Sequence, residues 1–277
     1  MNYRHAFHAG NFADLVKHAV LLEALAELTR EGPPLTVIDT HAGAGIYELD
    51  AAAPKASGEA AAGIGRLMAE AGPPAPLKAL KAAVARLNPK GGWRLYPGSP
   101  RLVADALRPA DRLVACELRP DDAGHLRQAL KAAPSAEVLV QDGFVLAAQR
   151  AAPRQRLLVL IDPPFERADD YARAAEAVRA VLARNREAAL LVWLPLKDLE
   201  TFDGFLRRLE AGGAPDALVI EARLRPLDDP MRLNGCVLVA INPPAGLEAE
   251  AAAACAWVVA HCGQVGGEAR VWRLGGG

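Results

Sequence analysis

The residues with the clearest chemical meaning are Asp162, Pro163, Pro164 and Phe165, which directly follow the apolar run LLVLI. The exocyclic amine of adenine is a poor nucleophile, because its lone pair is delocalised into the ring. Two acceptors aimed at its two N–H bonds would localise this pair, and the Asp162 carboxylate and the Pro163 carbonyl can supply them. The prolines stiffen the loop, and Phe165 offers a face on which an extruded base can stack. The segment predicts a catalytic loop for a base amine; a Pro-Pro turn capped by Asp162 is the structural alternative.

A second segment, Asn242 to Ala245, has the similar sequence Asn-Pro-Pro-Ala and also follows an apolar run. Its fourth residue is Ala245, which has no ring on which a base could stack. It also follows the last of the apolar runs, far across the expected sheet from the candidate cofactor residues. We therefore expect a structural turn at this position.

Two glycines, Gly43 and Gly45, follow the first apolar run at the point where α/β folds bind ligands. Glycine allows a ligand to approach the backbone closely, although a plain tight turn would use the same residues. A dinucleotide fingerprint needs a third glycine where this chain has Glu48. The segment therefore disfavours a nicotinamide oxidoreductase.

Polar residues also end the second and third apolar runs, as Glu117 and Asp142. A carboxylate in the position of Glu117 can accept hydrogen bonds from both hydroxyls of a ribose. Asp142 can bind an adenine amino group, with Gly143 and Phe144 beside the ring. A solvated acid and a common Asp-Gly turn are the structural alternatives. Three such signals at successive strand ends together favour an adenosine-containing cofactor.

These residues need a sheet to position them, and apolar runs of strand length recur along the chain. Most are apolar on both faces, as in the buried strands of a largely parallel sheet, and helical patterns separate most of them. We predict a doubly wound α/β fold with a seven-stranded, mostly parallel sheet. The seven runs span 35–39, 112–118, 137–142, 156–162, 188–194, 217–224 and 236–241.

One connection is far longer than a single crossover helix requires, because residues 40–111 separate the first run from the second. It contains two helical patterns separated by proline-rich breakers, and a short helix at 100–107 leads back to the sheet. We predict a single domain over 1–277, with a small helical insertion at 51–95.

Composition limits the classes of partner. The formal net charge of −1, with 52% hydrophobic and 23% charged residues, is typical of a folded protein without a basic coat. RNA must then bind a local patch, for which the sequence offers Arg4, Lys17 and five insertion residues. The five insertion residues are Lys78, Lys81, Arg86, Lys90 and Arg94.

No signal peptide and no run of roughly 18 apolar residues is present, so we expect a cytoplasmic protein without a membrane partner. The four cysteines form no Cys-x-x-Cys pair, so we expect reduced thiols.

An amphipathic helix is predicted to begin at Asn11 or just after it, with Phe12, Leu15, Val16, Ala19 and Leu22 on one apolar face. Lys17 and His18 fall beside that face, which is typical of solvated residues. His5 and His8 have the spacing of metal ligands, but no further cluster of His or Cys accompanies them, and we expect no metal.

Five motifs stand out along the chain: YRHAFHAGNFADLVKH (3–18), DTHAGAG (39–45), YPGSP (96–100), DGF (142–144) and DPPFE (162–166). They resemble those of the bacterial RlmJ family, in the same order and over essentially the whole chain. This family methylates the N6 atom of adenine in 23S ribosomal RNA. The resemblance implies a Rossmann-like class I fold that uses S-adenosylmethionine. Phe165 stands where the family often has tyrosine, which keeps the ring and loses a hydroxyl.

The resemblance also implies roles for individual residues. Asp162 would lie at the reacting amine, and Tyr3 and Lys17 near the RNA, to which we add Arg4 and His5. We expect the cofactor to be contacted by Lys17, His18, His41, Gly43, Ser99, Glu117, Asp142, Gly143 and Asp162.

The residues leave other functions open. A methyltransferase for adenine N6 in DNA or for protein glutamine could use the same loop, and a ribosome-assembly factor could bind RNA without turnover. Intact Asp162 and Phe165 disfavour the non-catalytic alternative. The expected partner is 23S ribosomal RNA, naked or in an assembly intermediate. We expect a monomer with no obligate protein partner.

Overall fold

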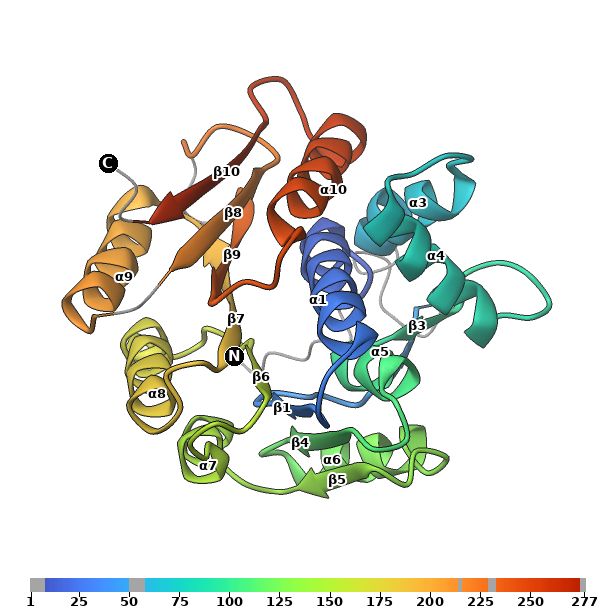
Figure 1. The fold of residues 1–277 in the computed structure, drawn as a ribbon. Helices are drawn as coiled ribbons and strands as arrows, with labels where there is room; N and C mark the ends of the chain where they lie inside the picture. The colour runs from blue at the N-terminus through green and yellow to red at the C-terminus, as the bar shows by residue number, and fades with distance from the viewer. Residues whose placement is uncertain (1–7, 50–57, 214–215, 229–232, 275–277) are drawn as a thin grey trace.

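The computed structural model describes residues 8–49, 58–213, 216–228 and 233–274. Within this part of the chain an eight-stranded sheet has the order β10-β8-β9-β7-β6-β1-β4-β5 (Figure 1). The pairs from β5 to β7 are parallel, whereas β9 runs antiparallel to both of its neighbours, β7 and β8. The α/β class and the mostly parallel, doubly wound sheet are therefore confirmed.

The strands of the large sheet are β1 (Thr36–Asp39), β4 (Arg112–Cys116), β5 (Ala136–Leu139), β6 (Leu157–Ile161), β7 (Ala189–Leu196), β8 (Ala217–Arg223), β9 (Gly235–Ile241) and β10 (Glu268–Leu274). The principal helices are α1 (Phe12–Arg30), α4 (Ala75–Leu87), α5 (Ser99–Ala106), α6 (Pro120–Ala129), α7 (Gly143–Arg150), α8 (Asp170–Arg184), α9 (Leu199–Ala211) and α10 (Leu247–Cys262).

The strand count differs from the expected seven, because β10 adds an eighth strand at the edge. All seven predicted runs form strands, but β10 has the sequence EARVWRL, in which charged and apolar residues are interspersed. It pairs antiparallel with β8 alone, and its side chains are half-buried or exposed. An edge strand with solvent on one side needs no continuous apolar run, so no such run marks β10 in the sequence.

A short antiparallel pair, β2 (Ile46–Glu48) and β3 (Leu95–Pro97), flanks the long connection. Between these strands the chain forms the π-helix η2 (Ala61–Gly65), the short helix α3 (Arg66–Ala69) and α4. The helices were expected, whereas the β2–β3 pair was not. The bounds of the insertion as a subdomain, 51–95, stay a prediction.

Helices cover both faces of the sheet, which therefore forms the middle of three layers (Figure 1). On one face Leu158 and Leu160 of β6 belong to the same hydrophobic core as buried residues of α1, α5 and α10. On the other face Val159 and Ile161 of the same strand belong to a second hydrophobic core with buried residues of α7, α8 and α9. This alternation along β6 explains why the run LLVLI is apolar throughout.

The order of the strands places a topological switch point at β1. From β1 the chain continues outward to β4 and β5, and then returns to the opposite side of β1 as β6. The connections on the two sides lead in opposite directions, so a crevice opens at the carboxyl ends of β1 and β6. The loop that begins at Asp162 and the glycine Gly43 that follows β1 both lie at this crevice.

Three cysteines are buried free thiols and the fourth, Cys262, is half-buried, as expected for reduced residues. None of the helices in the described ranges combines the length and the apolar character needed to cross a lipid bilayer.

Candidate active site

A cavity of 1070 Å³ lies at the carboxyl ends of β1, β4, β5 and β6. Its wall brings together residues that are distant in the sequence, because parallel strands end at the same edge of the sheet. Tyr3, Arg4 and His5 lie outside the described residues. The predicted residues that line the cavity are Lys17, His18, His41, Gly43, Ser99, Glu117, Asp142, Gly143, Asp162, Pro163 and Pro164.

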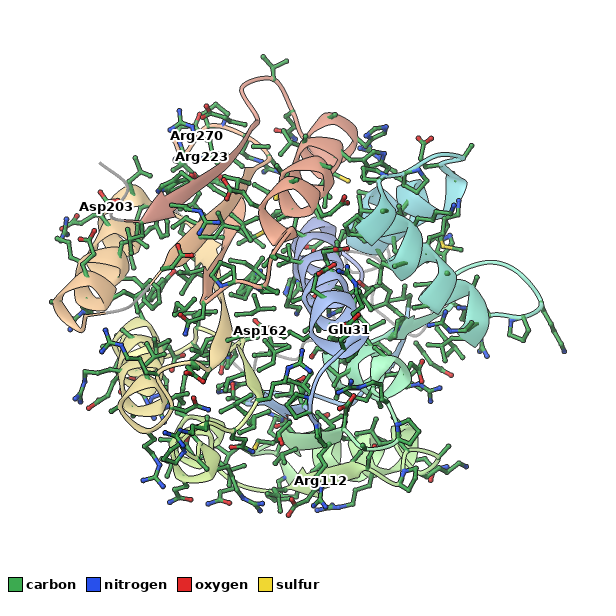
Figure 2. All side chains as sticks on the ribbon, in the orientation of Figure 1. Glu31, Arg112, Asp162, Asp203, Arg223 and Arg270 are labelled. Atoms are coloured by element: carbon green, nitrogen blue, oxygen red, sulfur yellow. The ribbon has the colours of Figure 1, made fainter. Side chains whose placement is uncertain are left out.

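Asp162 follows β6 and lies near the centre of the molecule, whereas Arg112 and Arg270 lie at its periphery in the same view (Figure 2). Its Oδ2 atom accepts a hydrogen bond of 2.6 Å from the ammonium group of Lys17. Pro163 is buried and Pro164 is exposed. The loop therefore begins inside the protein and reaches solvent within two residues.

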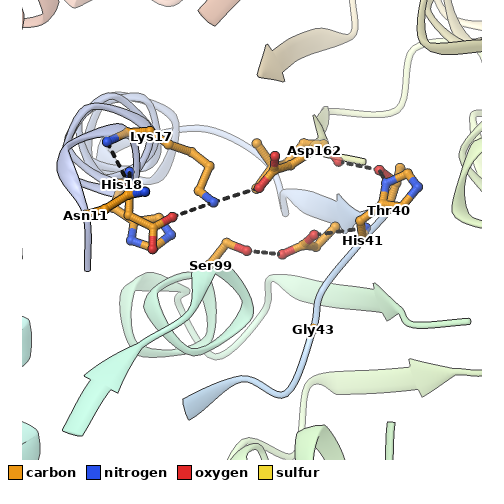
Figure 3. A network of polar contacts seen from close by, with 12 residues as sticks. Asn11, Lys17, His18, Thr40, His41, Gly43, Ser99 and Asp162 are labelled. Carbon is orange, nitrogen blue, oxygen red and sulfur yellow. Dashed lines mark hydrogen bonds and ion pairs between the residues drawn. The ribbon is translucent and has the colours of Figure 1, made fainter. Parts of the chain in front are cut away.

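Lys17 is only 3% exposed and lies between two carboxylates, those of Asp14 at 2.8 Å and Asp162 at 2.6 Å (Figure 3). Burial by itself would lower the pKa of Lys17, but the two ion pairs hold it well above its usual value. The expectation of a solvated lysine is therefore wrong. The reason is that the first turns of α1 pack against several other elements, which a single apolar stripe does not reveal. His18, expected beside Lys17 in solvent, is also buried.

The His18 ring is 1% exposed and stacks on Tyr96, with 5.5 Å between the ring centroids. Its Nδ1 atom lies 2.8 Å from the Tyr96 hydroxyl. Tyr96 belongs to β3, so the unpredicted β2–β3 pair supports one wall of the cavity.

Ser99 donates a hydrogen bond of 2.7 Å to Oδ2 of Asp39, the last residue of β1 (Figure 3). Asp39 is fully buried, and this burial raises the pKa of its carboxyl to about 6. Asp39 was not among the predicted site residues, although its place at the end of a buried strand was a usable signal. The Ser99 hydroxyl therefore already has a hydrogen-bond partner inside the protein.

His41 contacts Thr40 and the edge of Phe144, whose ring centroid is 4.7 Å away. Thr40 Oγ1 lies 2.7 Å from His41 Nδ1 and also donates to the Leu160 carbonyl at 2.9 Å. A hydroxyl carries one hydrogen, so both contacts are hydrogen bonds only if Nδ1 holds the imidazole proton. Burial lowers the pKa of His41 to about 4. The ring is therefore neutral at pH 7, with Nε2 as an acceptor.

Glu117 extends from the end of β4 and accepts two backbone hydrogen bonds. Oε2 accepts from the Gly43 N–H at 2.9 Å, and Oε1 accepts from the Arg119 N–H at 2.8 Å. These bonds fix the orientation of the carboxylate and leave each oxygen a further lone pair. Burial raises the pKa of Glu117, with the two backbone bonds acting in the opposite direction.

Asp142 caps α7, because Oδ1 accepts from the N–H groups of Phe144 and Val145. Its Oδ2 atom pairs with Arg173 at 2.6 Å, and the guanidinium of Arg173 lies 4.6 Å from the centroid of the Phe144 ring. Asp142 thus has a structural role besides any ligand contact. Arg173 was not predicted as a site residue, because no pattern in the sequence marks it. A Cβ atom on Gly143 would lie 1.9 Å from the Thr40 carbonyl oxygen, so this position requires glycine.

The Phe165 ring is not among the residues that line the cavity. It lies 4.7 Å from Tyr171 and 5.9 Å from Trp193, measured between centroids. The residue has a φ of 50°, an unusual value for a non-glycine residue. Its role in stacking a base stays a prediction.

The segment after β9 has the structural role that the sequence predicted. Asn242 adopts a φ of 48° and donates hydrogen bonds to the carbonyls of Arg186 and Ala188. These bonds tie the turn to the chain before β7.

The expected basic patch is not one continuous surface. Lys17 is buried in the cavity, Arg4 lies outside the described residues, and Lys81 is half-buried and donates to the Glu70 carbonyl. The exposed members are Lys78, Arg86, Lys90 and Arg94.

Comparison with known proteins shows the family. The sequence profile of the family described as Ribosomal RNA large subunit methyltransferase D, RlmJ, matches residues 32–274. A protein of Escherichia coli named Ribosomal RNA large subunit methyltransferase J is 34% identical over 90% of this chain and 89% of its own length. Its namesake from Haemophilus influenzae is also 34% identical, over 90% of each chain. A crystal structure of a Legionella pneumophila protein superposes with a TM-score of 0.90 at 27% identity, covering 97% of this chain and 99% of that one. On these matches, the chain belongs to the RlmJ family.

Proposed function

We propose that this chain transfers a methyl group from S-adenosylmethionine to the exocyclic N6 atom of an adenine in 23S ribosomal RNA. The relatives named as large-subunit ribosomal RNA methyltransferases support the substrate class. One observation carries the chemistry: Asp162 and Pro163 share a cavity with Glu117 and Asp142. An acceptor pair for an amine therefore lies beside the groups that suit an adenosine.

The polar groups of the cavity fit this cofactor. Glu117 has a lone pair on each oxygen for the two ribose hydroxyls, and Oδ2 of Asp142 can accept from the adenine amine while it holds Arg173. Asp162 adds a carboxylate to the wall of the cavity, where the cofactor would bring positive charge. When bound, S-adenosylmethionine supplies an electrophilic methyl group on a positively charged sulfur.

The catalytic loop supplies the acceptors for the adenine amine. Asp162 binds Lys17 through Oδ2, which leaves Oδ1 to accept one N–H bond of the amine, and the Pro163 carbonyl accepts the other. Both hydrogen bonds favour a lone pair localised on nitrogen and directed at the methyl group. The amine must lose a proton as its new N–C bond forms, and the Asp162 carboxylate is placed to accept it. Lys17 holds that carboxylate in place.

The target base must leave its stack to reach this loop. Phe165 is half-buried against Tyr171 and Trp193, and we assign its remaining face to the flipped adenine. Tyr3, Arg4 and His5 precede the described residues of the N-terminal segment, and we assign them to the flanking RNA.

Methyl transfer from labelled S-adenosylmethionine tests the proposal against its alternatives. The substrates are unmodified 23S ribosomal RNA, a ribosomal assembly particle that lacks the modification, an adenine-containing DNA duplex and a glutamine-containing peptide. We expect label in at least one of the two RNA substrates and in neither the DNA nor the peptide. Asp162→Asn should bind the cofactor and transfer little. Label in DNA or peptide alone, or equal transfer by Asp162→Asn, would overturn the proposal.

A further inference from the structure

A chain of four polar contacts connects the π-helix η2 to the catalytic carboxylate. The Ile64 N–H donates to the Gly10 carbonyl at 2.8 Å, and the Gly10 N–H donates to Asp14 Oδ2 at 2.9 Å. Asp14 Oδ1 then pairs with the Lys17 ammonium at 2.8 Å, and Lys17 pairs with Asp162 Oδ2 at 2.6 Å. We propose that Asp14 is a positioning residue for methyl transfer, which holds Lys17 against Asp162 and is itself held by η2.

Burial makes these contacts strong. Asp14 is 2% exposed and Lys17 is 3% exposed, so water competes little for their hydrogen bonds. Each Asp14 oxygen has a different partner, one on the Gly10 turn and one on Lys17. A shift of the Gly10 turn would therefore move the carboxylate that holds Lys17.

We call this chain of contacts, from Ile64 through Gly10, Asp14 and Lys17 to Asp162, the relay. Its Gly10 end fits tightly against η2. A Cβ atom on Gly63 would lie 2.2 Å from the Gly10 carbonyl oxygen and 2.9 Å from the Asn11 Cα atom. Only glycine at this position lets the π-helix seat the Gly10 turn at the start of α1. Isolated π-helical turns occur frequently at functional sites, in keeping with such a role.

The charge of Asp14 has a further consequence, which rests on the proposed function. Lys17 brings one positive charge to two carboxylates, so Asp14 and Asp162 share it. If Asp14 were neutral, Lys17 would compensate Asp162 alone and weaken its acceptance of the adenine N–H. Asp14 therefore keeps the catalytic carboxylate both oriented and available.

Asp14→Asn tests this role, because it keeps the size of the side chain and removes the charge. We expect the single-turnover rate of methyl transfer to 23S ribosomal RNA to fall about tenfold or more, the effect of losing one charge-assisted hydrogen bond. The dissociation constant for S-adenosylmethionine, measured by calorimetry, should stay within about twofold of the parent value, as Asp14 is assigned no cofactor contact.

The decisive comparison places the same change in a Lys17→Met background. If Asp14 acts through Lys17, Asp14→Asn lowers the rate of the parent but causes no further loss in Lys17→Met. An equal further loss in that background, or no loss in the parent, would overturn the proposal.

The remote end has a matched control in Gly72, where an added Cβ meets nothing within 4 Å. Gly63→Ala should lower the single-turnover rate, and Gly72→Ala should leave it at the parent value. Equal rates for the two variants would show that the fit of η2 against the Gly10 turn does not affect methyl transfer.

Melting temperatures test the coupling between Asp14 and Lys17 without RNA. Failure of the proposed function can therefore be distinguished from failure of this coupling. If the parent methylates no RNA, the proposed function fails and the relay is judged by stability alone. Asp14→Asn should lower the melting temperature of the parent by more than it lowers that of Lys17→Met, in which Asp14 has lost its ion pair with Lys17. Shifts that simply add would refute the coupling between Asp14 and Lys17.

Discussion

Asp39 and His41 have opposite effects on how the free energy of unfolding depends on pH. Burial raises the pKa of Asp39 from 3.8 to about 6, and burial lowers the pKa of His41 from 6.5 to about 4. Between these values the native protein keeps Asp39 protonated and His41 neutral, whereas the unfolded chain ionises both. As the pH rises from about 4 to about 6, Asp39 makes the native state less stable and His41 makes it more stable. The two contributions largely cancel in the parent.

Substitution of one residue removes the cancellation. The Asp39 shift is about two units, and one unit corresponds to 1.36 kcal/mol, so ionised Asp39 costs about 3 kcal/mol. Asp39→Asn keeps an oxygen that can accept from Ser99 and removes this cost. Relative to the parent, the variant should gain about 3 kcal/mol in its free energy of unfolding between pH 4 and pH 7. His41→Gln should show the opposite trend, because its free energy of unfolding relative to the parent should rise as the pH falls through the same range. We expect a smaller change of about 2 kcal/mol, since His41 is partly open to solvent at the cavity.

Urea unfolding followed by circular dichroism at pH 4.5, 5.5 and 7 measures these differences. Asp203 lies at the periphery of the molecule (Figure 2), and its side chain is exposed, so Asp203→Asn is a suitable control. The difference between this control and the parent should not vary with pH. If the difference for Asp39→Asn were equally independent of pH, Asp39 would be an ordinary ionised carboxylate, and our reasoning from its burial would be refuted.

Three further substitutions test the roles assigned to single residues. Glu117→Ala should weaken binding of S-adenosylmethionine by about 1.5–3 kcal/mol, as expected for hydrogen bonds to a charged group, and an unchanged dissociation constant in calorimetry would place the ribose elsewhere. Lys17→Met leaves the Asp14 and Asp162 carboxylates without their shared cation, so urea unfolding should show a loss of about 3–5 kcal/mol; a loss below about 1 kcal/mol would mean that water already compensates them. Phe165→Ala should weaken RNA binding by about 1–3 kcal/mol if the ring stacks on the target base, and equal affinities in a filter-binding titration would exclude that contact.

Much of the fold could be predicted because its strands are buried on both faces. The run LLVLI of β6 faces helices on either side of the sheet, so every position is apolar and the segment stands out. β10 has solvent beside it and mixes charged with apolar residues, so the same criterion missed it. The β2–β3 pair has strands of three residues each, too short for a periodic pattern.

The site was predictable to the extent that its residues follow strands. Glu117, Asp142 and Asp162 could be identified from the residues themselves, because each ends an apolar run. His18 and Ser99 came only from the family resemblance, since neither follows a strand of the large sheet. The burial of Lys17 depends on the packing of α1 against α4, α5 and α10, which are far apart in the sequence, so no local pattern could reveal it.

Identification of the methylated nucleoside tests the central claim most directly. Unmodified 23S ribosomal RNA is incubated with the protein and S-adenosylmethionine, digested to nucleosides and analysed by mass spectrometry beside an Asp162→Asn reaction. We predict N6-methyladenosine as the product, formed by the parent and nearly absent with Asp162→Asn, because the loop is built around acceptors for an exocyclic amine. A methyl group on a ribose 2′-oxygen, on a ring carbon or on another base would contradict the account.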